Sequence, residues 1–284
     1  MSETVAASLS RPSRRMSLAL REGHSRGSLS YLEMGNPDGP CLVFIHGFGA
    51  DLLAWHMCLV PLVTEFRLVA LDLPGHGRST LDVGDASLEA MTEWLDEALD
   101  LLDVREAGFV AHSMGAKIAL GYALLRPERV SRLALIAPAG LGGVADHGAL
   151  NQWLQSPSLE RAEAFARRLA APGREDLVRV LGAGMMDTVA NPQRLDALRY
   201  LLNVNEGGAM PSFQSNATFN GGELTQLRCP ILVMRGDHDV IVPPPHEGSL
   251  PLHSCIRLLP GVGHLPHMEA PREVIAELKV FFRG

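Results

Sequence analysis

The sequence has few cysteines and none of the spacings that would tie them together. Its four cysteines, Cys41, Cys58, Cys229 and Cys255, contain no Cys-x-x-Cys pair. Cys41 and Cys229 each open an apolar run, where a thiol behaves as a small buried hydrophobe. We therefore expect reduced cysteines in a cytoplasmic protein and no disulfide framework.

Long hydrophobic runs and an excess of positive charge are also missing. No stretch approaches the roughly 20 apolar residues that a membrane-spanning helix needs. The formal net charge is −7, with both signs mixed along most of the chain, which argues against nucleic acid or an anionic membrane as a partner. The first residues lack the apolar segment of a secretory signal, and Glu3 argues against a transit peptide. We expect residues 1–18 to form a flexible tail.

Short apolar runs alternate with longer helical patterns over most of the 284 residues. This alternation predicts the α/β class, with a parallel sheet and helices on both of its faces. The expected strands are 28–33, 42–46, 67–72, 107–111, 132–137, 231–235 and 255–259. The expected core helices are 52–64, 88–102, 114–125 and 271–282.

The alternation breaks between about 140 and 225, where no strong strand pattern occurs. Three helical patterns fill this stretch instead, at 150–169, 175–186 and 192–203. An insertion at the carboxyl end of a strand lies over the site of an α/β protein. We therefore expect a core of residues 19–140 and 226–284 and a helical cap of residues 141–225.

The stretch AHSMG, residues 111–115, stands between a predicted strand and a predicted helix. Ser113 in this place is either a nucleophile on a sharp turn or an ordinary helix N-cap. The sharp turn needs small residues two positions from the serine, because strand and helix backbones come close there. Gly115 meets this need, and Ala111 adds only one methyl group. The stretch alone favours the nucleophile.

A serine hydroxyl is a weak nucleophile without a base, and the base needs an orienting acid. When a serine nucleophile follows a strand of this kind of sheet, the acid and then the histidine follow late strands. Asp239 lies in the loop after the strand at 231–235, deeper than Asp237, which can cap the turn. His264 stands at the crest of the loop after the last strand, ahead of His267. Asp239 and His264 are therefore the preferred acid and base.

The same aspartates and histidines invite a metal-site interpretation. No His-Glu-x-x-His pattern or Cys/His ligand spacing is present, and alternating loop residues converge poorly on one ion. We therefore expect neither a metal nor another cofactor.

HGFG, residues 46–49, follows a buried predicted strand. Its glycines let backbone N–H groups turn toward the serine, so the expected oxyanion donors are the amides of Phe48 and Met114. The alternative is a plain glycine turn between strand and helix. HGFG becomes a specific signal only in combination with AHSMG.

In order along the chain, HGFG, DLPGHGRS, AHSMG, GDHDVIVP and GVGHLPHMEAP resemble the motifs of the α/β-hydrolase superfamily over about residues 28–283. The resemblance implies a mostly parallel eight-stranded sheet with a helical cap inserted after strand 6. It also implies a Ser113–His264–Asp239 triad, with Phe48 and Met114 as oxyanion donors.

Three stretches, DVGDASLEAM, LIAPAGLGG and GHLPHMEAP, look like the hydrolase-type domain of acetoin-dehydrogenase-associated dihydrolipoamide acyltransferases. No lipoyl module or Pro/Ala linker precedes the predicted sheet, so we expect a free-standing hydrolase. Its expected partner is a small acyl substrate, a carboxylic ester or thioester cleaved through an acyl-enzyme. Acyl transfer, C–C bond hydrolysis and a ligand-binding receptor of this fold stay open, as does the oligomeric state. Candidate pocket residues are Met185, Met186, Phe213 and Phe219.

Overall fold

The computed structural model describes residues 17–143, 145–202, 219, 221–246, 248, 250–252 and 254–284. Most of the expected tail and part of the expected cap, with Phe213, lie outside these residues. Among the described residues, no helix is long and apolar enough to cross a bilayer.

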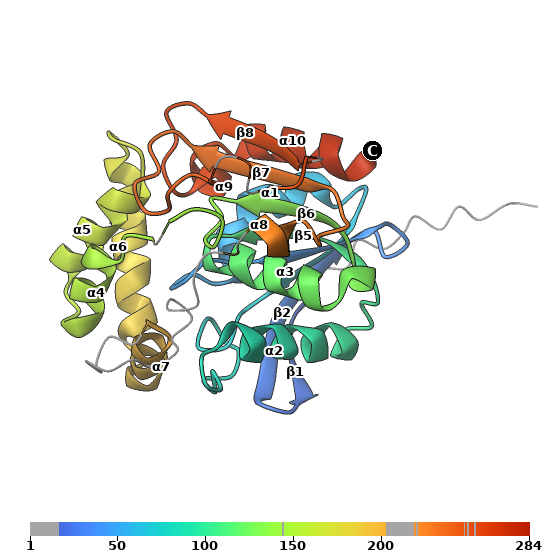
Figure 1. The fold of residues 1–284 in the computed structure, drawn as a ribbon. Coiled ribbons are helices and arrows are strands. Elements are labelled where there is room, and N and C mark those ends of the chain that lie inside the picture. Colours follow the sequence, from blue (N-terminus) through green and yellow to red (C-terminus); the bar gives the residue numbers. More distant parts are fainter. Residues whose placement is uncertain are drawn as a thin grey trace, which may run out of the picture.

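An eight-stranded sheet forms the centre of the molecule (Figure 1). Its strands are β1 (Ser17–His24), β2 (Gly27–Gly35), β3 (Cys41–Ile45), β4 (Arg67–Leu71), β5 (Ala107–His112), β6 (Val130–Ile136), β7 (Ile231–Gly236) and β8 (Ser254–Leu259). Their spatial order is β1-β2-β4-β3-β5-β6-β7-β8. β2 pairs antiparallel with β1 and β4, and every other pair is parallel. The predicted mostly parallel sheet is confirmed.

β1 was not among the predicted strands, and it begins at Ser17, inside the expected tail. Ser17 and Leu18, which fall within the expected tail, are thus strand residues. β1 is an edge strand whose residues are mostly exposed, with only His24 buried. A strand with little burial on either face has no alternation of apolar and polar residues for a sequence pattern to detect.

Helices cover both faces of the sheet. They comprise α1 (His56–Leu59), α2 (Leu88–Leu101), α3 (Met114–Leu125), α8 (Gly221–Leu224), α9 (Pro266–Glu269) and α10 (Pro271–Arg283), with short 3₁₀ helices η1 (Leu52–Trp55), η2 (Val60–Leu62) and η3 (Pro127–Arg129). The predicted helix at 52–64 is thus three short pieces, η1, α1 and η2. Pro61, in η2, cannot donate the backbone hydrogen bond that a continuous helix would need.

Alternate side chains of β5 enter two separate hydrophobic clusters. Phe109 and Ala111 belong to the cluster that includes buried residues of α2 and α3. Val110 belongs to the other cluster, with Val274 and Leu278 of α10. Successive side chains of a strand point to opposite faces, so a strand covered on both faces is apolar throughout. This is why β5 shows a continuous apolar run in the sequence.

In the described part of the chain between β6 and β7, four further helices form a lobe beside the carboxyl ends of the strands (Figure 1). They are α4 (Gly148–Gln155), α5 (Leu159–Leu169), α6 (Glu175–Val189) and α7 (Pro192–Leu202). The predicted helical insertion after strand 6 is confirmed. The single helix expected at 150–169 is instead two, because the chain leaves the helical path before Pro157 and Ser158 caps α5.

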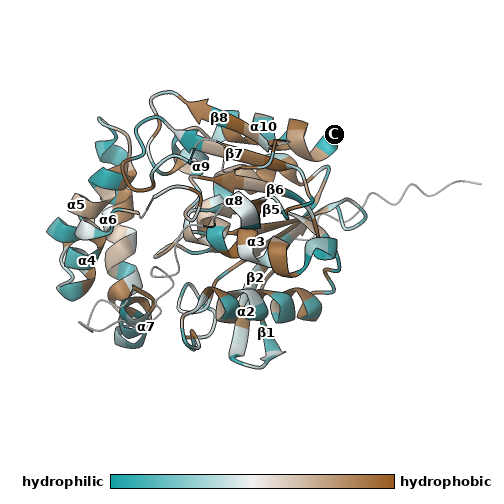
Figure 2. Ribbon diagram, viewed as in Figure 1, coloured by the Kyte–Doolittle hydropathy of each residue, from teal (hydrophilic) through white to brown (hydrophobic). Residues whose placement is uncertain are grey.

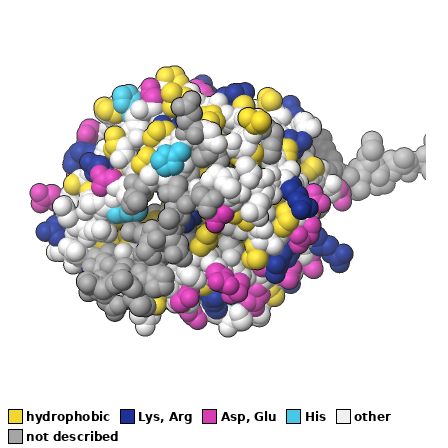
Figure 3. Space-filling view, in the orientation of Figure 1, with side chains coloured by type: hydrophobic (Ala, Val, Ile, Leu, Met, Phe, Trp, Pro, Cys, Tyr) yellow, Lys and Arg dark blue, Asp and Glu magenta, His cyan; other side chains and the backbone are white. Residues whose placement is uncertain are grey.

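Figure 2 shows hydrophobic residues along the central strands and hydrophilic residues over much of α4 and α5. The face of the molecule seen in Figure 3 carries hydrophobic side chains scattered among charged ones. In Figure 3, Lys and Arg side chains are interspersed with Asp and Glu on the visible face.

Candidate active site

Ser113 occupies a sharp turn between β5 and α3. Its φ is 51° and its ψ is −114°, in a region that residues other than glycine rarely adopt. The backbone holds this conformation through an N–H bond to the Ile136 carbonyl (3.0 Å), while the Ser113 carbonyl accepts from Ala139 (3.2 Å). The Ser113 hydroxyl makes no capping bond to α3. The helix-cap alternative therefore does not describe this serine.

The turn is possible because the neighbouring backbones come very close. A Cβ on Gly115 would lie 2.4 Å from the His46 carbonyl oxygen, and one on Gly47 would lie 2.6 Å from His112 Nδ1. Either substitution would force backbone or ring atoms apart. Ala111 is fully buried, so the residue that departs from glycine fits here. The HGFG loop thus runs directly past Ser113.

The structure brings Ser113, His264 and Asp239 together in a chain of hydrogen bonds. His264 Nε2 lies 3.0 Å from Ser113 Oγ, and His264 Nδ1 lies 2.9 Å from Asp239 Oδ2. The side chains of His264 and Asp239 are 3% and 0% exposed. These residues come from loops after β5, β8 and β7, which end on the same side of the sheet.

The Asp239 carboxylate is held by more than the histidine. Its Oδ1 accepts the N–H groups of Ile241 (2.9 Å) and Val242 (3.1 Å). Burial raises the pKa of Asp239, but His264 and the two N–H donors together outweigh burial and leave this pKa below its ordinary value. The carboxylate therefore stays ionised and its orientation is fixed.

The competing residues of the same loops lie elsewhere. Asp237 Oδ1 accepts the N–H of Gly261 at 2.7 Å, so it ties the turn that follows β8. The His267 ring packs 4.6 Å from Trp55 and 4.6 Å from His112, between centroids. Neither side chain bonds Ser113 or His264 among the described contacts.

Two residues that the sequence reasoning did not select support the His264 loop. His112 Nε2 donates to the His264 carbonyl oxygen (2.9 Å). Glu269 Oε1 accepts the N–H of Gly263 (3.0 Å) and of Leu265 (3.3 Å), while its Oε2 accepts the N–H of Ala171 (2.8 Å). Glu269 therefore joins the loop to the segment after α5 in the cap.

Of the two expected oxyanion donors, Met114 directly follows Ser113, and Phe48 follows Gly47, where a Cβ would lie 3.2 Å from Ser113 Cβ. Met114 is the first residue of α3, so its N–H has no carbonyl one turn earlier within the helix. Phe48 lies in the HGFG loop, whose shape is braced by His46: Nδ1 donates to the Gly47 carbonyl (2.7 Å) and Nε2 accepts from Leu73 N–H (3.0 Å). Burial lowers the pKa of His46 to about 4, so this bracing imidazole is neutral.

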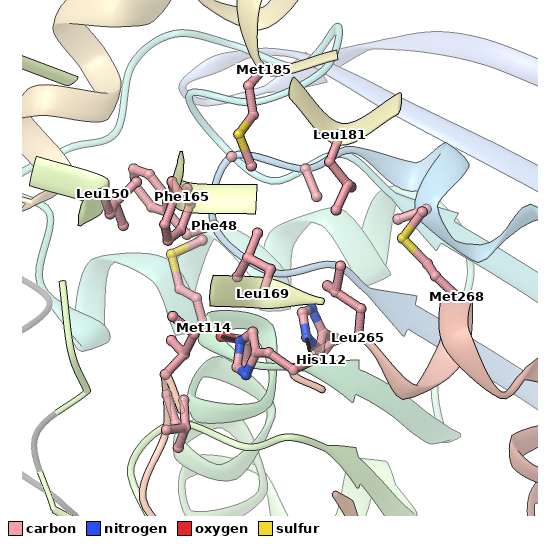
Figure 4. Close-up of a pocket in the computed structure, with 18 of the residues that line it drawn as sticks. Phe48, His112, Met114, Leu150, Phe165, Leu169, Leu181, Met185, Leu265 and Met268 are labelled. Atoms are coloured by element: carbon pink, nitrogen blue, oxygen red, sulfur yellow. Dashed lines mark hydrogen bonds between the residues drawn. The ribbon is translucent and has the colours of Figure 1, made fainter. Parts of the chain in front are cut away.

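A cavity of about 530 Å³ opens above Ser113 and His264, between core and cap. Figure 4 shows apolar side chains around it from both parts of the molecule. They include Phe48, Met114, Leu150, Phe165, Leu169, Leu181, Met185, Leu265 and Met268. Of the candidate pocket residues, Met185 lines the cavity. Met186 and Phe219 pack against the hydrophobic cluster that contains Phe109 and Ala111 of β5. Within the described residues, no group of three or more His, Cys, Asp or Glu side chains could hold a metal ion.

Reactive side chains on loops at the carboxyl ends of a capped, mostly parallel sheet define an α/β hydrolase. The sequence comparison leads to the same class, because the model of the Alpha/beta hydrolase family matches residues 42–278. The chain belongs to this family.

The chain is 31% identical over 259 residues to the dihydrolipoyllysine-residue acetyltransferase component of the acetoin cleaving system of Pseudomonas putida, and 30% identical over 247 residues to that of Cupriavidus necator. These alignments cover 90% and 86% of this chain but only 66% and 63% of those proteins. It is also 28% identical to the (E)-2-((N-methylformamido)methylene)succinate hydrolase of Acinetobacter baylyi, over 86% of this chain and 90% of that one.

Among solved structures, the 2-hydroxy-6-oxo-6-phenylhexa-2,4-dienoate hydrolase of Rhodococcus sp. strain RHA1 superposes with a TM-score of 0.80. The superposition covers 95% of this chain and 100% of that one, at 20% identity. At this identity the likeness shows the shared fold.

Proposed function

We propose that this chain hydrolyses a small to medium carboxylic ester or thioester through an acyl-enzyme. In this proposal Ser113 is the nucleophile, His264 the general base and Asp239 the orienting acid. The observation that carries it is the continuous hydrogen-bond chain from Ser113 Oγ through His264 to Asp239, with distances of 3.0 and 2.9 Å. A hydroxyl hydrogen-bonded to an imidazole, itself held by a buried carboxylate, is an activated nucleophile.

The first half-reaction acylates the serine. Ser113 Oγ attacks the substrate carbonyl carbon while His264 Nε2 takes the hydroxyl proton, and Asp239 stabilises the imidazolium that forms. The N–H groups of Phe48 and Met114 hold the negative oxygen of the tetrahedral intermediate. One such donor typically contributes about 3–4 kcal/mol to the transition state. The intermediate then collapses, and the leaving alcohol or thiol takes the proton from His264.

The second half-reaction restores the enzyme. Water attacks the acyl-serine carbonyl while His264 accepts one of its protons, and the collapse returns that proton to Ser113 Oγ. The products are the carboxylic acid and the free enzyme. The apolar cavity suits an acyl chain of moderate length, because such a pocket binds mainly through buried apolar surface.

Acyl transfer is a second candidate for the same site. It is favoured by the 31% and 30% identity to the two acetyltransferase components. In that reaction a thiol or alcohol replaces water in the second half-reaction. C–C bond hydrolysis would use the same side chains. The likeness to the dienoate hydrolase, at 20% identity, supports a shared fold and does not favour this reaction over the others.

A panel of p-nitrophenyl esters from acetate to octanoate tests the proposal. We expect turnover by the wild type, labelling of Ser113 by a fluorophosphonate, and loss of both in Ser113→Ala. Ser87→Ala is the matched control, because Ser87 caps α2 and should change only stability. Absence of both turnover and labelling would overturn the proposal. Adding a thiol such as dihydrolipoamide, and measuring how acyl product partitions between thiol and water, separates transferase from hydrolase.

A further inference from the structure

A histidine of the cap faces the same cavity, and no step of the proposed reaction uses it. His147 directly precedes α4, and its carbonyl accepts the N–H of Asn151 (2.8 Å), so it begins the first turn of the helix. His147 and Leu150 both line the cavity, and residues three apart lie on one face of a helix. Figure 4 shows Leu150 beside Phe165 in the cavity wall. His147 therefore places a polar ring next to an apolar part of this wall.

The backbone that carries His147 is held in place relative to the candidate triad. The N–H of the preceding residue, Asp146, donates to the Ile241 carbonyl (2.8 Å). The Ile241 N–H in turn donates to Asp239 Oδ1 (2.9 Å). The Asp146 carboxylate also pairs with Arg168 of α5. A short path of hydrogen bonds thus joins the start of α4 to the carboxylate of the candidate triad, which fixes the point from which the His147 side chain extends.

The protein makes no use of the hydrogen-bonding capacity of the His147 ring. The ring does not cap α4, and none of the residues that the structure describes hydrogen-bonds to it. Other polar side chains that line the cavity are engaged. Asp51 accepts the Leu53 N–H (2.8 Å), and the Thr188 hydroxyl donates to the Gly184 carbonyl (2.9 Å). The half-buried His147 ring is therefore able to bond a molecule that enters the cavity.

The surroundings of His147 keep its ring uncharged near pH 7. Burial lowers its pKa, Asp146 raises it, and His264 and Lys117 lower it further, which leaves the pKa below its ordinary value. A neutral imidazole has one N–H donor and one acceptor nitrogen. The influence of His264 on this pKa also indicates that the two rings lie near each other across the cavity.

The contents of the cavity decide whether this ring is satisfied. A hydrocarbon chain packed against the ring would remove it from water without giving it a partner, which costs free energy. A keto or hydroxyl oxygen at the same place accepts the imidazole N–H and avoids that cost. A neutral imidazole offers no opposite charge to a carboxylate, so an uncharged oxygen suits it better.

We propose that His147 determines specificity by donating its imidazole N–H to an uncharged keto or hydroxyl oxygen that the substrate carries near the ester or thioester cleaved at Ser113. This inference rests on the proposed function and narrows its substrate class. The oxygen belongs either to the acyl part or to the leaving group. Both present the same acceptor to the ring, and separate substrates distinguish them.

Two sets of matched esters test this assignment. In the acyl set, p-nitrophenyl 4-oxohexanoate and 5-oxohexanoate are compared with p-nitrophenyl hexanoate. In the leaving-group set, 4-acetylphenyl hexanoate is compared with 4-isopropylphenyl hexanoate, which has a similar shape and no keto oxygen. Each ester is compared between wild type and variant, so the intrinsic reactivities of the esters cancel.

In His147→Leu, kcat/KM should fall by about 3- to 10-fold for at least one keto ester, the effect of losing one neutral hydrogen bond. For its hydrocarbon counterpart, kcat/KM should be unchanged or higher. His147→Gln keeps an N–H donor and should keep part of the preference. The matched control is Gln152→Leu, a polar-to-apolar change at an exposed position of α4, which should alter kcat/KM for none of the esters.

Equal losses on keto and hydrocarbon esters in His147→Leu would overturn the assignment, and so would equal activity of wild type and variant on every ester. If His147→Leu does not fold, inhibition of the wild type still decides. Either an oxohexanoate should inhibit at a lower concentration than hexanoate does, or 4-hydroxyacetophenone at a lower concentration than 4-isopropylphenol. Equal inhibition within both comparisons would contradict the role of His147.

Failure of the proposed function gives a different result. No turnover of any ester and no fluorophosphonate labelling of Ser113 would overturn both proposals together. Turnover and labelling with no effect of His147 on the keto esters would overturn only the assignment of His147.

Discussion

Several buried histidines surround Ser113, and their environments separate their roles. Burial lowers the pKa of His46 to about 4 and, with the neighbouring His46, that of His76 to about 3. It also lowers the pKa of His112 well below its ordinary value. These imidazoles are therefore neutral hydrogen-bonding and packing groups near pH 7. Among the histidines that the structure describes, only His264 has one ring nitrogen on Ser113 and the other on a carboxylate.

The buried, neutral state of His267 predicts a pH dependence of stability. Burial, reinforced by His264 and His56, lowers the pKa of His267 to about 3, whereas an unfolded histidine titrates near 6.5. Between these values the unfolded chain binds a proton that the native protein does not. The contribution of the neutral His267 to the free energy of unfolding is therefore complete above about pH 6.5 and is lost as the pH falls toward 3.

His267→Phe removes this contribution while keeping a ring beside Trp55. As the pH falls from 6 to 4, the free energy of unfolding should fall less steeply in the variant than in the wild type. The two slopes should differ by about 1.4 kcal/mol per pH unit, the value for one proton. Urea unfolding at several pH values, followed by circular dichroism, measures both slopes. Identical slopes would show that His267 is protonated in the native state.

At the scale of single elements, Glu269 of α9 links the cap to the catalytic loop. Its two oxygens accept N–H groups from Gly263, Leu265 and Ala171. The His264 N–H also donates to the Leu169 carbonyl (2.7 Å) at the end of α5. The position of the His264 ring is therefore set jointly by α9 and by the end of α5, which are far apart in the sequence.

Glu269→Gln keeps the size of the side chain but replaces one acceptor oxygen by an NH₂ group, which cannot accept. We expect kcat for each p-nitrophenyl ester that is turned over to fall by a similar factor, about tenfold, with KM nearly unchanged, because His264 is less well positioned. The rate of fluorophosphonate labelling should fall by the same factor. The free energy of unfolding should drop by about 1–3 kcal/mol. A rise in KM alone, with kcat unchanged, would assign Glu269 to substrate binding.

The strands that could be predicted from sequence are those buried on both faces, such as β5, whose apolar run is continuous. AHSMG was informative because the close approach of backbones restricts the residues around Ser113. β1 could not be predicted, since a mostly exposed edge strand has no apolar pattern. The bond between Glu269 and Ala171 joins residues 98 positions apart, and no local pattern encodes such a contact. Local physics thus predicted the sheet and the candidate triad, while tertiary contacts supplied the support for the His264 loop.

At the scale of the whole molecule, the cap closes the cavity over the core and should set the length of the acyl chain. Met185 and Met186 are neighbours on α6, yet only Met185 lines the cavity. Met185→Ala should therefore move the preferred p-nitrophenyl ester toward longer chains, because it enlarges the space above Ser113. It should also cost about 2–3 kcal/mol of stability, as large-to-small changes of buried residues do. Met186→Ala removes the same number of atoms outside the cavity wall, so it should leave the chain-length profile of kcat/KM unchanged. Equal shifts in the two variants would mean that the cap acts on activity through its overall stability and not through the shape of the cavity.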